Sequence, residues 1–184
     1  MSLRVLSTVV AISLLVTGCG TATRIPERDT TAAISGTLRV DSVHVHLSPV
    51  AEMQHQFNAA FAPAALAELL ARRLGQKGLQ TGDSSNTLDV EMTFIHVRSE
   101  FIAFIVPVGL DVLSATVTVN DAAGRALRRF DISANSSAGT NTHLAKERTR
   151  LDILNEHLAL LVIAQLQGQG CVTAFAYKTW SCDE

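Results

Sequence analysis

Residues 113–134 read LSATVTVNDAAGRALRRFDISA, and this stretch decides the fold. In its first part, apolar residues alternate with polar ones, which is the period of a strand buried on one face. Its centre, residues 120–124, has the composition of a hairpin turn, and the chain then returns through residues 126–134. The stretch therefore predicts two neighbouring antiparallel strands.

The same alternation predicts two more strands before this hairpin. One runs over residues 88–98, with Phe94 as the last member of its buried set. The other runs over residues 37–47, where the apolar positions change parity and indicate a bulge or a kink near residues 41–42. Residues 51–62 are consistent with a loop or a short helix.

Two stretches have the period of an amphipathic helix. The first begins at Pro63, a residue favoured in the first helical turn, and ends near Gly75, which can supply a left-handed cap. The second ends at Gly168, and Arg150 is expected on its solvated face, at the right spacing to pair with Glu147. The leucines that mark the two apolar faces are Leu66, Leu69, Leu70 and Leu74, and then Leu144, Leu151, Leu154, Leu158 and Leu161.

Strands and helices that are apolar on one face bury that face most simply in two layers. The sequence therefore predicts an α+β fold, a two-layer sandwich with two helices packed on one face of a sheet of about four to five strands. We expect this domain to occupy residues 35–184.

The composition excludes two broad classes of protein. Apolar residues make up 47% of the 184 residues and charged ones 17%, which excludes a largely disordered chain. The 15 Lys and Arg against 17 Asp and Glu give a formal charge of −2. This balance excludes the broad basic surface of a nucleic-acid-binding protein, so we expect no nucleic acid among the partners.

The N-terminus has the pattern of an export signal. An apolar run over residues 5–16 follows a single charged side chain, Arg4, and no acidic residue precedes Glu27. The run is shorter than the about 20 helical residues that cross a membrane. It is therefore interpreted as the apolar region of a signal peptide.

The run ends in LVTGC, residues 15–19, which resembles the lipobox of bacterial lipoproteins. The resemblance implies that residues 1–18 are removed, that the Cys19 thiol receives a diacylglyceryl group and that its new amine is acylated, with fatty acids such as palmitate. Two or three chains anchor a protein stably, whereas one is marginal. Gly20 rather than Asp follows, and resemblance to Gram-negative sorting favours the outer membrane, facing the periplasm. The alternative is an ordinary secretory signal that contains a cysteine.

Residues 19–34 are small and polar and are interpreted as a tether between the lipid and the folded domain. Once Cys19 carries lipid, Cys171 and Cys182 remain, and the oxidising periplasm favours a disulfide between them. Two unpaired thiols are the alternative. The spacing is neither C-x-x-C nor a zinc pattern, so redox catalysis and a structural metal lack support.

The order of motifs resembles that of small bacterial envelope lipoproteins of unassigned function. The matching pieces are the lipobox, the helix ending LLARRLGQKGL over residues 69–79 and the turn VTVNDAAG over residues 117–124. The α/β module is also similar to that of curli-secretion-type lipoproteins. The chain lacks an obvious pore-forming segment, so the resemblance does not imply a channel, and it implies no catalytic residues.

Three histidines are the nearest approach to a metal site, although we expect no metal or other cofactor. His44 and His46 lie two apart on a predicted strand and project from one face, where His96 from a neighbouring strand could join them. Three imidazoles can bind Zn²⁺, Cu²⁺ or Ni²⁺. The alternative is that they are polar residues on the wet face of a half-buried sheet.

Residues 101–110 are nearly all apolar but contain Pro107 and Gly109. As a buried strand they would belong to the core. As a loop they would mark a contact with a partner or with lipid, and Pro and Gly favour such an irregular segment. The residues that would make this contact are Phe101, Ile102, Phe104 and Ile105.

No motif supports an enzyme. Residues 82–85, GDSS, resemble the start of certain lipases and esterases, but the only Asp-x-x-His stretch, residues 41–44, lies upstream in a predicted strand. G-x-S-x-G, phosphate-loop and H-E-x-x-H patterns do not occur. We therefore expect a non-enzymatic, lipid-anchored periplasmic protein of the outer membrane that binds an unknown envelope component. The alternatives are an accessory lipoprotein of an envelope transport or secretion complex and a histidine-based metal-binding protein.

Overall fold

The computed structural model describes residues 21–23, 37–99, 101–102, 111–136 and 147–168. The sheet contains β1 (Thr21–Thr23), β2 (Ser42–Leu47), β3 (Thr87–His96), β4 (Asp111–Asn120) and β5 (Ala126–Ser136), and the helices are α1 (Pro49–His55), α2 (Pro63–Gln76) and α4 (Glu147–Leu166).

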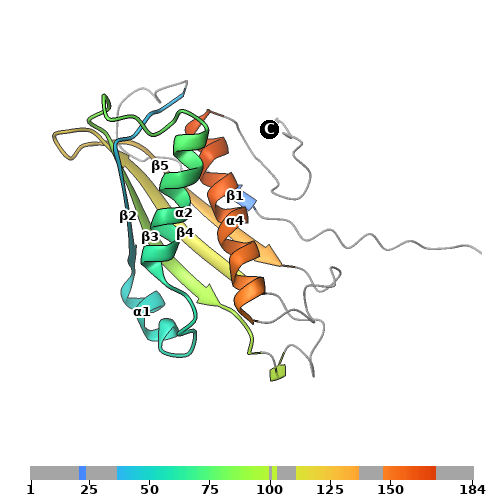
Figure 1. Ribbon diagram of the computed structural model, residues 1–184. Helices are drawn as coiled ribbons and strands as arrows, with labels where there is room; N and C mark the ends of the chain where they lie inside the picture. Colours follow the sequence, from blue (N-terminus) through green and yellow to red (C-terminus); the bar gives the residue numbers. More distant parts are fainter. Residues whose placement is uncertain (1–20, 24–36, 100, 103–110, 137–146, 169–184) are drawn as a thin grey trace, which may run out of the picture.

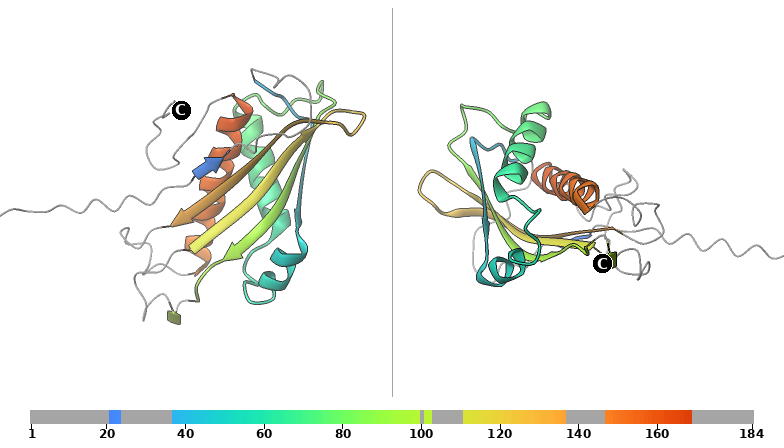
Figure 2. Two further views of the ribbon diagram at one scale, coloured as in Figure 1. Left: turned by 180° about the vertical axis from the view of Figure 1, so that it is seen from behind. Right: turned by 60° about the horizontal axis from the view of Figure 1, so that its bottom comes forward.

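The five strands form one sheet in the order β1-β5-β4-β3-β2. The β2–β3 pair is parallel and the other pairs are antiparallel. Helices α2 and α4 lie side by side across one face of the sheet, while α1 lies at one end of it (Figures 1 and 2). The predicted α+β sandwich with two helices on one face is confirmed.

The core between the two layers is built from the predicted apolar positions. All four leucines of α2 are buried, as are the predicted leucines Leu151, Leu154, Leu158 and Leu161 of α4. Proline stands in the first turn of α2 as expected. The predicted cap is wrong, because α2 continues through Gly75 and the chain turns at Gly78, whose φ is 66°. There the Leu79 backbone N–H donates to the Leu74 carbonyl at 2.9 Å, an arrangement that requires a left-handed residue.

The β4–β5 hairpin forms where the sequence predicts it. The Asp121 carboxylate accepts hydrogen bonds from the backbone N–H groups of Ala123 and Arg125, both at 2.9 Å. Gly124 takes a φ of 77°, which a residue with a side chain rarely adopts. The turn fixes the register that pairs Val117 with Phe130 in the core.

A bulge in β3 reverses one prediction. Leu88, Val90 and Met92 face the core, but the register with β4 shifts between Met92 and Phe94. The extra residue turns Phe94 outward, where 39% of it is exposed, and Ile95 takes the inward position.

The start of the domain also differs in part from the prediction. The expected bend before β2 is confirmed, because Val40 pairs with Gln80 while β2 pairs with β3. Residues 21–23, however, belong to the sheet rather than to a free tether, since Thr21 pairs with Ser133. The outer edge of β5 offers unpaired backbone groups, and the short threonine-rich segment satisfies some of them.

Arg150 is buried, so its predicted place on a solvated helix face is wrong. Its Nε donates to Asp111 Oδ2 at 2.9 Å, and Arg98 Nε donates to Asp111 Oδ1 at 3.0 Å. The Arg98 backbone N–H also donates to Oδ1, at 2.9 Å, and Arg150 Nη2 donates to the Arg98 carbonyl. These contacts join α4, which carries Arg150, to the start of β4, which carries Asp111, and to the segment just after β3, which carries Arg98.

Several predicted features lie outside the described residues. They are the lipidation site Cys19, the cysteines Cys171 and Cys182, the apolar residues Phe104 and Ile105, and Leu144 of the last helix.

Candidate interaction surface

Six large apolar side chains are exposed in the part of the chain that the structure describes. The elements that carry them lie at one end of the sheet, where β2 and β3 finish and β4 begins, with α1 and residues 101–102 on either side (Figures 1 and 2). The β4–β5 hairpin lies at the opposite end. We call this surface the apolar end; its members are Val50, Met53, Phe57, Phe94, Phe101 and Ile102.

Helix α1 turns apolar side chains toward solvent and polar side chains toward the sheet, which is the opposite of the usual arrangement. Val50 and Met53 lie i, i+3 on the outward face of α1, and Phe57, which is 87% exposed, lies in the turn two residues after the helix ends at His55. Gln54 and Asn58, which are polar, lie on the inward side. A helix whose apolar face is exposed to solvent in the isolated protein indicates a surface that a partner or a membrane covers when the protein functions.

The inward polar side chains hold α1 against the edge of β3. Strand β2 ends at Leu47, which would leave the following backbone groups of β3 without a neighbouring strand. The Ile95 N–H donates to Gln54 Oε1 at 2.8 Å, and the Val97 N–H donates to Asn58 Oδ1 at 2.9 Å. The two side chains thus replace the missing strand and fix the orientation of the outward apolar face.

The other members of the apolar end come from β3 and from residues 101–102. The bulge turns Phe94 outward, beside the ring of His96. Phe101 is 70% exposed and Ile102 46% exposed, so these two residues do not belong to the core. For these two residues, which are helical, the exposure is at odds with the buried-strand alternative; the rest of the apolar run lies outside the described residues.

The three candidate histidines do not converge. His44 and His46 are exposed on β2, and His46 Nδ1 lies 3.1 Å from the Asp89 carboxylate. His96 follows the part of β3 that pairs with β2, about 13 Å farther along the strand. In the described part of the chain, no three His, Cys, Asp or Glu side chains gather closely enough to hold a metal ion.

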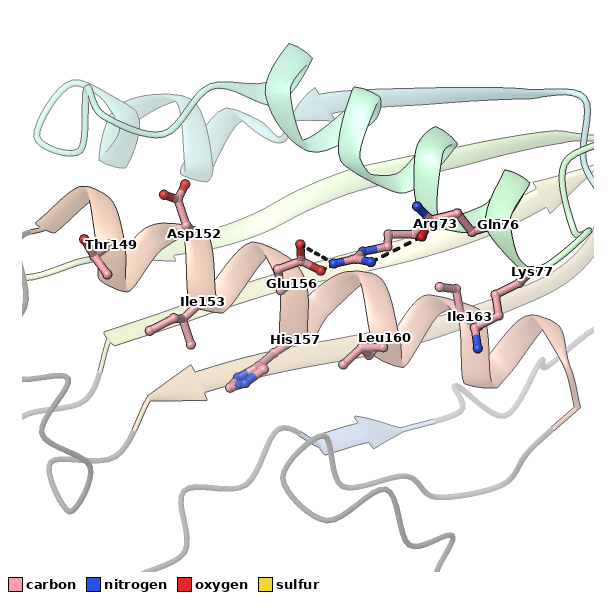
Figure 3. A pocket seen from close by; sticks show the side chains of 10 residues that line it. All are labelled: Arg73, Gln76, Lys77, Thr149, Asp152, Ile153, Glu156, His157, Leu160 and Ile163. Atoms are coloured by element: carbon pink, nitrogen blue, oxygen red, sulfur yellow. Dashed lines mark hydrogen bonds and ion pairs between the residues drawn. The ribbon is translucent and has the colours of Figure 1, made fainter.

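A groove of about 720 Å³ runs along α4 beside the end of α2 (Figure 3). Arg73 reaches across it, and its Nη2 donates to Glu156 Oε1 at 2.8 Å. The lining contains two cations, Arg73 and Lys77, and two acids, Asp152 and Glu156, so its charges balance and favour neither an anionic nor a cationic ligand. Burial lowers the pKa of His157 in this groove, although the nearby Glu156 charge acts in the opposite direction.

The buried cluster around Asp111 is a structural site. Burial alone would raise the pKa of Asp111, but hydrogen bonds from Arg98 and the charges of Arg98 and Arg150 outweigh it and hold the pKa below its ordinary value. The carboxylate is fully inaccessible to solvent, so it cannot meet a substrate without a change of fold.

Sequence reasoning missed α1 as a functional element. The spacing of Val50, Met53 and Phe57 was a signal for one apolar helical face, but the same pattern usually indicates a face turned toward the core. Only the contacts of Gln54 and Asn58 reveal which way the helix faces. Across the described ranges, no helix combines the length and the apolarity that are needed to span a membrane.

No protein-family model and no curated protein matches the chain. Solved structures with partial similarity include a PelC dodecamer from Paraburkholderia phytofirmans, 12% identical over 76% of this chain and 94% of that chain, with a TM-score of 0.46. A minor lipoprotein from Acinetobacter baumannii is 14% identical over 72% of this chain and 97% of that chain, with a TM-score of 0.42. Similarity at this level assigns the chain to no family.

Proposed function

We propose that this chain is a lipid-anchored protein of the bacterial envelope, held at the periplasmic side of the outer membrane, and that it acts by binding rather than by catalysis. The lipobox-like residues 15–19 support the anchor. The apolar end is the observation that carries the binding role, because six exposed large apolar side chains at one end of a small domain favour a surface that becomes covered.

The polar side chains that resemble parts of an enzyme site make hydrogen bonds that stabilise the fold, which supports a non-enzymatic role. In the Gly-Asp-Ser stretch, Ser84 Oγ donates to the Arg39 carbonyl at 2.9 Å and accepts from the Asn86 N–H at 3.2 Å. These bonds shape a turn. Among the described residues, the most deeply buried carboxylate, that of Asp111, holds α4 to the sheet.

Metabolic labelling with radioactive palmitate in the native host tests the anchor. The wild-type chain and Cys171→Ser should incorporate label and fractionate with the membrane, whereas Cys19→Ser should incorporate none. The Cys171→Ser variant is the matched control, because it removes a different thiol. Equal labelling of Cys19→Ser, or an unlabelled wild type, would contradict the proposed anchor.

A further inference from the structure

We infer that the apolar end docks into the interfacial layer of the same membrane that holds the lipid anchor, so that α1 and residues 101–102 contact lipid. This inference rests on the proposed function, because it takes Cys19 as the point of attachment. It adds an orientation: the long axis of the sheet stands on the membrane with the apolar end down and the β4–β5 hairpin pointing away.

The pairing of β1 with β5 shows at which end of the sheet the chain enters β1. β1 is antiparallel to β5, with Thr21 opposite Ser133 and Thr23 opposite Asp131. The chain therefore enters β1 from the side on which β5 ends, at Ser136. Ser136 pairs with Asp111 at the start of β4, and this is the end of the sheet at which β3 carries the exposed Phe94.

The short stretch of chain between Cys19 and β1 limits how far the lipid anchor can lie from the sheet. Cys19 precedes Thr21 by two residues, so it can lie no farther than about 7 Å from that residue. The ten-residue strand β4 separates the two ends of the sheet by about 33 Å. A membrane attached at Cys19 is therefore close to the apolar end and far from the hairpin.

The chemistry of the surface selects lipid as the occupant. The outward face of α1 presents Val50 and Met53, and the turn after the helix presents Phe57; these side chains suit the boundary between headgroups and acyl chains, where interfacial helices insert about 5–10 Å. Helix α1 contains one acidic residue, Glu52, and no Lys or Arg. Docking should therefore depend on apolar insertion and not on anionic lipid. Because the covalent anchor keeps the apolar end next to the membrane, the effective concentration of this small apolar surface at the membrane is high.

Tryptophan substitution measures the depth of each end. In a Trp180→Phe background, Phe57→Trp reports on the apolar end and Ala123→Trp on the exposed tip of the hairpin. Each full chain is purified from the native host and reconstituted in phosphatidylethanolamine–phosphatidylglycerol vesicles that contain brominated phosphatidylcholine. A second arm replaces residues 1–19 by a hexahistidine tag bound to nickel-chelating lipid, so that docking is measured whether or not Cys19 is acylated.

The expected result is quenching at Phe57→Trp at least about threefold stronger than at Ala123→Trp in both arms, because bromine quenches only residues at membrane depth. Equal or absent quenching at both positions in the tagged arm would overturn the docking and favour a protein as the occupant of the apolar end. Mass spectrometry of the first arm reports acylation separately. A chain that lacks acyl groups but is quenched at Phe57→Trp in the tagged arm would refute the anchor and retain the docking surface.

Discussion

Replacing Asp111 by Asn should destabilise the domain far more than any surface substitution on the same elements. The carboxylate is inaccessible to solvent and accepts hydrogen bonds from the backbone N–H and Nε of Arg98 and from Nε of Arg150, at 2.9–3.0 Å. Removing the acid from a buried ion cluster leaves two guanidinium charges to repel each other and costs about 3–5 kcal/mol. An amide keeps the shape but lacks the charge, and its NH₂ group faces donors.

Urea unfolding followed by circular dichroism measures the loss. With a slope of about 2 kcal/mol per M for a domain of this size, a loss of 4 kcal/mol moves the midpoint by about 2 M. Asp152→Asn, an exposed position on α4, is the matched control and should change stability by no more than about 0.5 kcal/mol. A loss below about 1 kcal/mol for Asp111→Asn would refute the role given to the cluster.

Acid titration provides a second measurement of the same cluster. The folded pKa of Asp111 lies below its ordinary value of 3.8, so the unfolded chain binds a proton at a higher pH than the folded chain does. The stabilisation is therefore present above pH 3.8 and is lost as the pH falls below it. The difference in stability between wild type and Asp111→Asn should shrink in that acid range.

Three further predictions use the same unfolding assay. Gly75→Ala should stabilise the domain by about 0.5–1 kcal/mol, because this helical glycine has open space around it. Gly78→Ala should instead destabilise it by about 1–2 kcal/mol, because Gly78 has a positive φ. A change of the same sign for both variants would contradict the cap assigned to Gly78. Gln54→Ala should cost about 1–3 kcal/mol by removing the acceptor for a backbone N–H of β3, and an effect as small as that of the exposed control Gln76→Ala would refute the contact. The lowered pKa of His157 means that stability is present above its ordinary value of 6.5 and is lost as the pH falls below it, so His157→Gln should flatten the pH profile between about pH 7 and 5.

The elements of the fold could be predicted because their signals are local. The alternation in β4 and the leucine spacing of α2 each repeat over a single element, and burial follows that period directly. The hairpin was predictable for the same reason, since Asp121 and Gly124 act within five residues of each other.

The errors arise where distant segments meet. Arg150 has the helical spacing of a surface residue, and it is buried because Asp111, 39 residues away in sequence, lies under it. Phe94 continues the alternation of its strand, but a bulge against β4 reverses its direction. Neither outcome has a signature within a short window of sequence.

The sequence by itself determined the two layers of this protein, because the periodicity that predicts them depends only on neighbours along the chain, whereas lipidation at Cys19 stays a prediction. The tertiary structure decided the composition of the apolar end. Side chains from α1, from the bulge in β3 and from residues 101–102 share one surface because β2 stops at Leu47, and Gln54 of α1 and Asn58 just after it complete the edge of β3 in its place. The backbone N–H groups of Ile95 and Val97 have no strand partner there, and their hydrogen bonds to Gln54 and Asn58 help to set the direction of that surface.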